Sequence, residues 1–255
     1  MTDVRLNRGL SAPPALEDVP RETSGAVQTC LIDLGFPCHL ACCGCDRTPE
    51  ESAGYSRARR KMRAAFRARR ADVLRLVFFG GDPFALPVSF EDLLGEAAAE
   101  SQARGIVLEG IALSNGTNWR LDQVHRFASL GVRDYHVALD GPASAHNRSR
   151  PAKHGSSFER ILNSLRWHRD AAHVELRIDA TLSKADRTEL LTLLQQEELC
   201  RGRNPVTLTF GPRRSCRQYA AWLATAAGPR PRPAPPALTL RLELQHVDAS
   251  PERLG

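Results

Sequence analysis

The sequence predicts an α/β protein built on one parallel β-sheet. Strand-like and helix-like segments alternate along the chain until six strands have been passed, an order that favours a parallel sheet with crossover helices. The strand-like segments are continuous apolar stretches, as expected when both faces of a sheet are covered. The chain has 255 residues, a length that α/β barrels often reach as one domain. We therefore expect ligands to gather at the carboxyl ends of the strands.

The predicted elements follow one another with clear boundaries. The first strand, in "AVQTCLIDLG", is β-rich and stops at a glycine, and the second, in "VLRLVFFGG", stops at two. The third and fourth, in "IVLEGIALSNG" and "RDYHVALDG", also end in turn-forming Asn, Asp and Gly. The predicted strands span 26–35, 73–81, 106–116, 133–141, 173–183 and 206–211, and the predicted helices span 57–70, 89–104, 119–129, 156–170 and 185–199.

The net charge of +6 comes from one segment. Residues 57–70 hold eight Arg and Lys and no acidic residue, so the rest of the chain has a net charge of about −2, six minus eight. Apolar residues recur in this segment at helical spacing, namely Ala58, Met62, Ala65 and Phe66. This pattern favours an amphipathic helix with a solvated basic face. The alternative is a docking surface for an acidic peptide or for nucleic acid phosphate. Aromatic residues are only 6% of the chain, so no base-stacking platform accompanies the segment.

We expect the chain to have three parts. Residues 1–24 form a polar leader without the apolar region of a secretory signal, residues 25–227 form the core domain, and residues 228–255 form a Pro-rich linker followed by a strand or tail. No apolar run has the length that crosses a membrane. We therefore expect a cytoplasmic protein that does not bind membranes. In that reducing compartment, clustered cysteines are metal ligands or catalytic groups more often than disulfides.

Four of the seven cysteines lie within "FPCHLACCGCDR". Cys38, Cys42 and Cys45 follow a C-x3-C-x2-C spacing that would share one face of a helix, but Pro37 and Gly44 disfavour a regular helix there. A zinc site is one interpretation, because Cys42 and Cys45 form a C-x2-C pair, although a second ligand pair further on is usual and none is evident. Three thiolates from one compact loop also suit a [4Fe–4S] cluster with one iron left open.

Short polar motifs follow the next three strands. They read "GGDP", "SNGT" and "LDGP", and each consists of turn-forming residues. In a parallel sheet they would lie on the same rim as the cysteine loop. The loop, these motifs and the later "VALDGPASAHNRSRPAKHGSSFERIL" resemble the radical S-adenosylmethionine (SAM) superfamily. The resemblance is closest to its peptide-modifying branch, which includes the sulfatase maturases, and it runs from about residue 26 to about residue 211.

This resemblance implies a fold, two cofactors and a set of contacts. The fold is a partial (β/α)6 TIM-like barrel of the radical SAM type. Cys38, Cys42 and Cys45 would hold a [4Fe–4S] cluster whose open iron binds SAM, and one-electron cleavage of SAM would give a 5′-deoxyadenosyl radical that abstracts a hydrogen atom from the substrate. The implied SAM contacts are Gly80 and Gly81 at the methionine moiety, Asp82 and Pro83 at its ammonium group, and Asn115, Asp140 and Arg150 at the ribose or the carboxylate. Arg150 suits a two-pronged grip on the carboxylate, and no catalytic side chain is assigned.

The sequence also departs from the usual motifs of this branch. The departures are Gly44 in place of an aromatic residue, Asp82 in place of Glu, Ala138 in place of Ser and Asn147 in place of Asp. Many relatives carry a cysteine-rich C-terminal extension with further clusters, whereas only two cysteines follow the barrel here. No role is assigned to the cysteines outside the triad, which are Cys30, Cys43, Cys200 and Cys216.

The expected function is therefore a radical SAM enzyme that modifies a peptide or protein. Its expected partners are that substrate and a one-electron donor such as a flavodoxin or ferredoxin. One alternative is a radical SAM enzyme that acts on a small molecule or on RNA, and the basic segment keeps RNA open as the less favoured partner. The other alternative is a non-catalytic protein that binds a metal or cluster and regulates a partner.

Overall fold

Six parallel strands form one sheet, and their order in the sheet is their order in the sequence. This confirms the predicted α/β class and the predicted partial (β/α)6 barrel. The computed structural model describes residues 26–35, 38–43, 45, 54–68, 70–168, 173–179, 182–197, 199, 206–211 and 215–225. The strands are β1 (Val27–Asp33), β2 (Val73–Phe79), β3 (Val107–Ser114), β4 (Val132–Leu139), β5 (His173–Asp179) and β6 (Thr207–Gly211).

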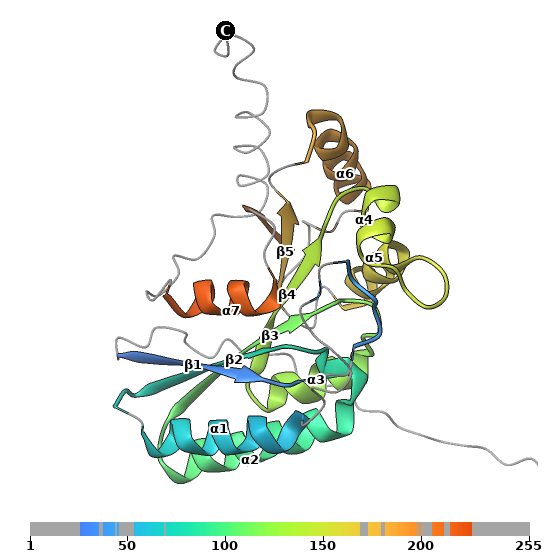
Figure 1. Ribbon diagram of the computed structural model, residues 1–255. Helices are drawn as coiled ribbons and strands as arrows, with labels where there is room; N and C mark the ends of the chain where they lie inside the picture. Colours follow the sequence, from blue (N-terminus) through green and yellow to red (C-terminus); the bar gives the residue numbers. More distant parts are fainter. Residues whose placement is uncertain are drawn as a thin grey trace, which may run out of the picture.

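Helices follow every strand, and those of the first half cover one face of the sheet. In Figure 1, α1, α2 and α3 lie together below β1, β2 and β3, while α7 lies on the opposite side of these strands. The helices are α1 (Gly54–Arg67), the short 3-10 helix η2 (Pro83–Ala85), α2 (Pro87–Ala103), α3 (Leu121–Ser129), α4 (Ala143–Ser149), α5 (Ser157–His168), α6 (Lys184–Gln196) and α7 (Cys216–Thr225).

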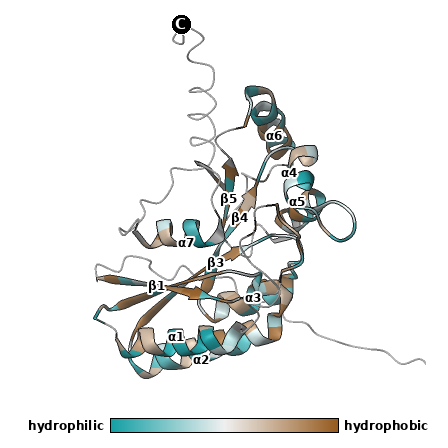
Figure 2. Cartoon of the chain, viewed as in Figure 1, coloured by the Kyte–Doolittle hydropathy of each residue, from teal (hydrophilic) through white to brown (hydrophobic). Residues whose placement is uncertain are grey.

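The main hydrophobic core lies between the sheet and the outer helices. Phe78 of β2 packs edge-on against Phe90 of α2, with ring centroids 5.1 Å apart, and Phe90 packs in the same way against Phe127 of α3. Figure 2 shows the strands largely in the hydrophobic colour and hydrophilic residues along α1 and α2. The apolar stripe predicted for the basic helix is buried, namely Ala58, Met62, Ala65 and Phe66. The interpretation of α1 as an amphipathic helix with a solvated basic face is therefore confirmed.

Helix α7 covers the inner face of the sheet and was not predicted. Its Tyr219, Ala220 and Leu223 pack against side chains that point inward from β2 and β3, among them Val77 and Ile111. These side chains form a second, smaller core on the face opposite the main one. The inner face of the first three strands is therefore occupied by a helix.

Two further points concern the predicted organisation. The short helix α4 was also not predicted, and it lies within the motif segment that follows β4. The predicted leader, residues 1–24, and the predicted linker and tail, residues 228–255, lie outside the described residues. The same holds for Gly44 and Cys200. Among the described residues, none of the helices is long and apolar enough to cross a membrane.

Candidate functional site

The cysteine loop is fixed to the segment that follows helix α4. The backbone N–H of Ala41 donates to the carbonyl oxygen of Pro151 at 3.0 Å, and that of Cys43 donates to the carbonyl oxygen of Ser149 at 2.8 Å. These bonds join parts of the chain that are more than a hundred residues apart in sequence. The loop therefore lies on the rim made by the carboxyl ends of β1 and β4, as predicted from the parallel topology.

Two of the three predicted cluster ligands receive hydrogen bonds from other rim residues. Asn115 Nδ2 donates to Cys38 Sγ at 3.3 Å, and Arg150 Nη1 donates to Cys42 Sγ at 3.9 Å. Cys38 and Cys42 are half-buried, and Cys45 is exposed. Hydrogen bonds to cysteine sulfurs are one of the means by which proteins tune metal–sulfur centres.

The described residues contain no ready-made cage of three or more Cys, His, Asp or Glu side chains. The assignment of Cys38, Cys42 and Cys45 as metal ligands thus stays a prediction. Cys43 is exposed, and its thiol points to the carbonyl oxygen of Arg148 at 3.5 Å. Cys30 lies in β1 and packs against the main core, where burial raises the pKa of its thiol.

Asp82 is a buried carboxylate, and only one of its two oxygens accepts a hydrogen bond from the described residues. Its side chain accepts a hydrogen bond at Oδ1 from the hydroxyl of Ser114, at 2.8 Å. Oδ2 is buried and accepts no hydrogen bond from the described part of the chain. The nearest cationic candidate is His39, whose Nδ1 lies 3.8 Å from Oδ2. Because a buried carboxylate oxygen without a partner is costly, this atom fits a ligand that brings a cationic donor.

The backbone around Asp82 explains the residues of the "GGDP" motif. Gly80 has φ of 87°, in the left-handed region that favours glycine, whereas Gly81 does not. Pro83 is buried and begins the 3-10 helix η2, where its fixed φ is suited to the first helical position. Only one of the two glycines is therefore required by the turn itself.

Ser114 is a site residue that the sequence reasoning missed. It ends β3, and besides donating to Asp82 its hydroxyl oxygen accepts the indole N–H of Trp119 at 2.8 Å. The neighbouring Asn115 accepts at Oδ1 from both the backbone and the hydroxyl of Thr117. These two bonds orient the amide group so that its Nδ2 reaches the cysteine loop.

Asp140 and Arg150 form a charged pair at the end of β4. Arg150 Nε donates to Asp140 Oδ2 at 2.9 Å, and the hydroxyl of Ser149 donates to the same oxygen at 2.6 Å. The side chains are largely buried, with exposed fractions of 15% for Arg150 and 8% for Asp140. Because Nε of Arg150 donates to Asp140, a bidentate pair of hydrogen bonds from Arg150 to a ligand carboxylate would have to come from Nη1 and Nη2.

His146 of α4 is hydrogen-bonded to the backbone of Asp140. Its Nδ1 accepts the backbone N–H of Asp140 at 3.1 Å. Burial lowers the pKa of His146 to about 4, Arg150 adds to that shift, and Asp140 opposes it. The ring is therefore neutral at pH 7, with its proton on Nε2, a buried atom that has no hydrogen-bond partner among the described residues.

Asn147 takes over the role expected of an aspartate at this position. Its Oδ1 accepts from the hydroxyl of Ser157 and from the backbone N–H of Phe158, both at 3.0 Å. These donors lie at the beginning of α5, so the side chain caps that helix through space. Its Nδ2 donates to the hydroxyl of Ser156 at 2.9 Å. The departure from the usual motif thus keeps an oxygen acceptor where one is needed.

The barrel interior holds a separate polar cluster. Tyr219 of α7 donates its hydroxyl proton to Glu175 Oε1 at 3.1 Å and lies 2.9 Å from His136 Nδ1. The guanidinium of Arg177 stacks on the Tyr219 ring, 3.7 Å from its centroid. Tyr219 thus links α7 to β4 and β5. Sequence reasoning missed this cluster because no element was predicted between the sixth strand and the Pro-rich linker, where α7 lies.

The chain is similar to known proteins in sequence and in fold. No family model matches the chain. The chain is 24% identical over 215 residues to the sporulation killing factor maturation protein SkfB of Bacillus subtilis (strain 168), an alignment that covers 77% of this chain and 48% of SkfB. The chain therefore spans about half the length of that relative.

Solved structures share the fold. The anSMEcpe protein with bound AdoMet and Kp18Cys peptide has a TM-score of 0.58 at 15% identity, over 74% of this chain and 52% of the other. SuiB of Streptococcus suis bound to its precursor peptide SuiA has a TM-score of 0.51 at 12% identity, over 72% of this chain and 39% of the other. At these identities the likeness is one of fold, the partial barrel of the radical SAM type. Together with SkfB, it confirms the predicted resemblance to the radical SAM superfamily and its peptide-modifying branch.

Proposed function

We propose that this chain is a cytoplasmic radical SAM enzyme that modifies a peptide or protein. The observation that carries the proposal is the convergence on one rim of three features: the cysteine loop, the Asp140–Arg150 pair, and Asp82 Oδ2, which accepts no hydrogen bond from the described residues. When bound, a [4Fe–4S] cluster and SAM supply one-electron cleavage of a carbon–sulfur bond of SAM, giving a 5′-deoxyadenosyl radical that takes a hydrogen atom from the substrate.

The three loop cysteines would hold the cluster. Cys38 and Cys42 already receive donors from Asn115 and Arg150, and such bonds stabilise a thiolate over a thiol. Cys45 follows in the same loop, its backbone N–H donating to the carbonyl oxygen of Cys42 at 3.2 Å. With three protein ligands, one iron is left for an exchangeable ligand.

The remaining rim residues match the charged ends of a bound amino-acid moiety. Asp82 Oδ2 is a buried acceptor that suits an ammonium group, and Gly80 brings the backbone to that position in a turn that other residues rarely adopt. Arg150 suits a carboxylate, and Asp140, which also accepts from the Ser149 hydroxyl, holds its guanidinium in place. Both charges of the moiety would then be matched by groups that the fold fixes before binding.

The substrate class is supported by the relatives. SkfB is a maturation protein, SuiB has been solved with a precursor peptide, and anSMEcpe has been solved with a peptide. We extend a peptide or protein substrate to this chain, together with a one-electron donor such as a flavodoxin or ferredoxin.

The experiment that tests this function is anaerobic reconstitution with iron and sulfide, followed by assay of 5′-deoxyadenosine from SAM with dithionite as reductant. The wild-type chain should bind iron and sulfide and form the product. Replacement of any one triad member, as in Cys42→Ala, should abolish both, because three thiolates are the minimum here. The matched control is Cys43→Ala, which should keep both. Equal loss in the control would refute the assigned triad.

A further inference from the structure

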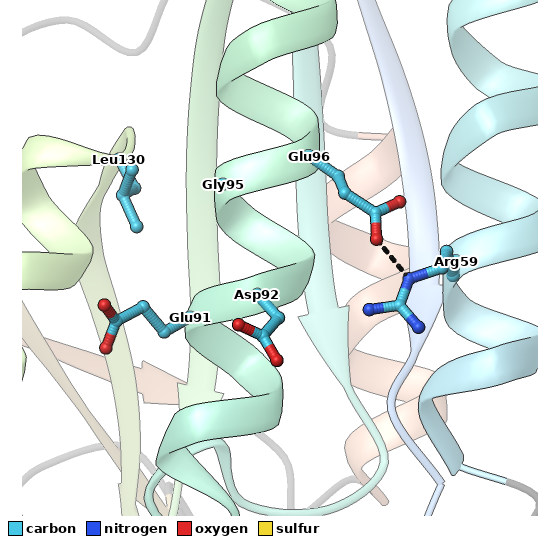
Figure 3. A pocket seen from close by; sticks show the side chains of 6 residues that line it. All are labelled: Arg59, Glu91, Asp92, Gly95, Glu96 and Leu130. Carbon is cyan, nitrogen blue, oxygen red and sulfur yellow. Dashed lines mark ion pairs between the residues drawn. The ribbon is translucent and has the colours of Figure 1, made fainter.

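Helix α1 carries two sets of basic side chains that face different surroundings. It contains six Arg or Lys residues and no acidic residue. Arg59 and Arg63, four positions apart and hence on one flank, both pair with Glu96 of α2. Figure 3 shows the Arg59 side chain directed toward Glu96. These two residues, with Asp92 and Gly95, line a surface hollow of about 560 Å³. On this flank the Glu96 carboxylate offsets part of the positive charge.

The other basic side chains of α1 have no such pairing with α2. These are Arg57, Arg60, Lys61 and Arg67, and all four are exposed. In the part of the chain that the structure describes, no carboxylate forms an ion pair with any of them. We call these four residues the basic face of α1.

The basic face is unfavourable for the helix that carries it. Arg57 lies in the first turn of α1, where the helix dipole disfavours positive charge, and no acidic residue offsets it there. Arg57 and Lys61 are also like charges at i and i+4, an arrangement that destabilises a helix by about 0.2–0.5 kcal/mol. These charges carry a small cost for the described helix, which an acidic partner would offset.

The basic face adjoins the candidate site. Helix α1 is the first element after the cysteine loop and connects β1 to its parallel neighbour β2. Its first turn, which contains Tyr55, therefore lies at the end of the sheet where β1 and β2 have their carboxyl ends. Burial raises the pKa of Tyr55, and the Asp82 carboxylate raises it further. From Tyr55 to Lys61 the helix rises by about 9 Å. A partner seated on Arg57, Arg60 and Lys61 would thus lie next to the rim.

We propose that the basic face of α1 docks a small acidic electron-transfer protein, one with a flavin or an iron–sulfur centre. This inference rests on the proposed function, in which each SAM cleavage consumes one electron. The donor is oxidised by one electron, and the site beside α1 is reduced by one. An acidic surface on the donor complements the basic face and steers the encounter. Single-stranded RNA fits less well, because the aromatic residues of α1, Tyr55 and Phe66, are turned toward the core and offer no stacking platform.

A binding measurement tests the proposal without a loaded cluster. Oxidised flavodoxin and a plant-type ferredoxin would be titrated calorimetrically into the full-length chain at about 50 mM and about 300 mM salt. At least one of them should bind at low salt and weaken at high salt. The double variant Arg57→Glu/Arg60→Glu should raise its Kd about tenfold or more. The control Arg104→Glu/Lys184→Glu changes the net charge equally at exposed sites on α2 and α6, and should change Kd by less than about twofold.

The outcomes separate this inference from the proposed function. Dithionite needs no docking surface, so dithionite-driven 5′-deoxyadenosine formation should be equal in the wild type and in Arg57→Glu/Arg60→Glu, while donor-driven formation falls. Absence of product with dithionite in the wild type would refute the proposed function and leave the binding result to stand by itself. The docking proposal is overturned if neither donor binds or if both double variants weaken binding equally. It is also overturned if a short labelled RNA binds more tightly than either donor and loses affinity only in the α1 variant.

Discussion

The rim and the Tyr219–His136–Glu175 group of the barrel interior both contain buried polar side chains, and they differ in how many of these are hydrogen-bonded within the protein. In the interior cluster, Tyr219 joins His136 and Glu175 in hydrogen bonds that close within the protein. On the rim, Asp82 Oδ2 and His146 Nε2 are buried and have no hydrogen-bond partner among the described residues. Since folded proteins pair nearly all of their buried polar atoms, the interior cluster is suited to holding the fold together and the rim is suited to holding a ligand.

The largest expected effect on ligand binding comes from substitution of Asp82 on the rim. In Asp82→Asn the amide oxygen can still accept from Ser114, but the negative charge is lost. We expect the affinity for SAM to fall by about tenfold to a hundredfold, since hydrogen bonds to charged groups contribute about 1.5–3 kcal/mol. The unfolding free energy should stay equal or rise, because a buried unpaired charge is removed. Equilibrium dialysis with labelled SAM, together with urea unfolding, measures both.

One result would contradict the prediction for Asp82→Asn. If Asp82→Asn bound SAM as tightly as the wild type but unfolded more easily, then the Asp82 carboxylate would be a structural group. The rim would then resemble the interior cluster, and the distinction between the two would be lost.

The pH dependence of stability tests the buried histidine of the rim. The pKa of His146 is lowered to about 4, mainly by burial, whereas an unfolded histidine has a pKa of about 6.5. The native state is thus favoured above pH 6.5, and it loses stability as the pH falls from about 6.5 to about 4, because only the unfolded state takes up the proton. The loss should reach about 3 kcal/mol.

Urea unfolding at several pH values checks this, with His146→Asn as the comparison. Asn can accept the backbone N–H of Asp140 in place of Nδ1 but does not titrate. The variant should therefore lose less stability than the wild type on acidification. An identical pH dependence in both proteins would contradict the assignment of the slope to His146.

Substitution of two buried tyrosines tests the same comparison through the free energy of unfolding alone. Tyr219→Phe removes the hydroxyl that bridges His136 and Glu175, and should cost about 1–3 kcal/mol of unfolding free energy. Tyr135→Phe is the matched control, because the Tyr135 hydroxyl is buried in the main core without a hydrogen-bond partner among the described residues. This second variant should be neutral or more stable than the wild type. Equal destabilisation by the two substitutions would show that the hydrogen bonds of Tyr219 contribute nothing.

The smallest effect is expected at Asn147. Asp in its place would accept from the same Ser157 and Phe158 donors, and its charge would be favourable near the beginning of α5. The bond that Asn147 donates to Ser156 would be lost, so Asn147→Asp should change stability by less than about 1 kcal/mol. Asn147→Ala, which removes the cap, should cost about 1 kcal/mol. Thermal unfolding distinguishes the two outcomes.

The sequence was sufficient for the sheet because its strands are continuous apolar runs that end at glycines. The two missed helices lack such a signal. Helix α4, "ASAHNRS", has no apolar periodicity, and α7, "CRQYAAWLAT", is short and packs against the sheet through Tyr219, Ala220 and Leu223. Their positions are decided by tertiary contacts, which override local propensity.

Only part of the candidate site could be predicted, because some of its features are visible as spacing along the chain and others depend on tertiary contacts. Spacing along the chain identifies the cysteines, but the bond between Asn115 and Cys38 joins residues 77 positions apart and depends on strand register. Ser114 was missed because a single serine at a strand end is a common turn residue. Trp119, five residues later in "SNGTNW", was the available signal, since a buried indole N–H needs an acceptor.

The central claim is that the rim binds SAM at a cluster held by Cys38, Cys42 and Cys45. Electron paramagnetic resonance of the reconstituted, dithionite-reduced chain tests it most directly. We expect a signal from the reduced cluster that changes when SAM is added, because SAM would bind the iron that has no cysteine ligand. A colourless protein that takes up zinc, gives no such signal and leaves SAM intact would contradict the claim.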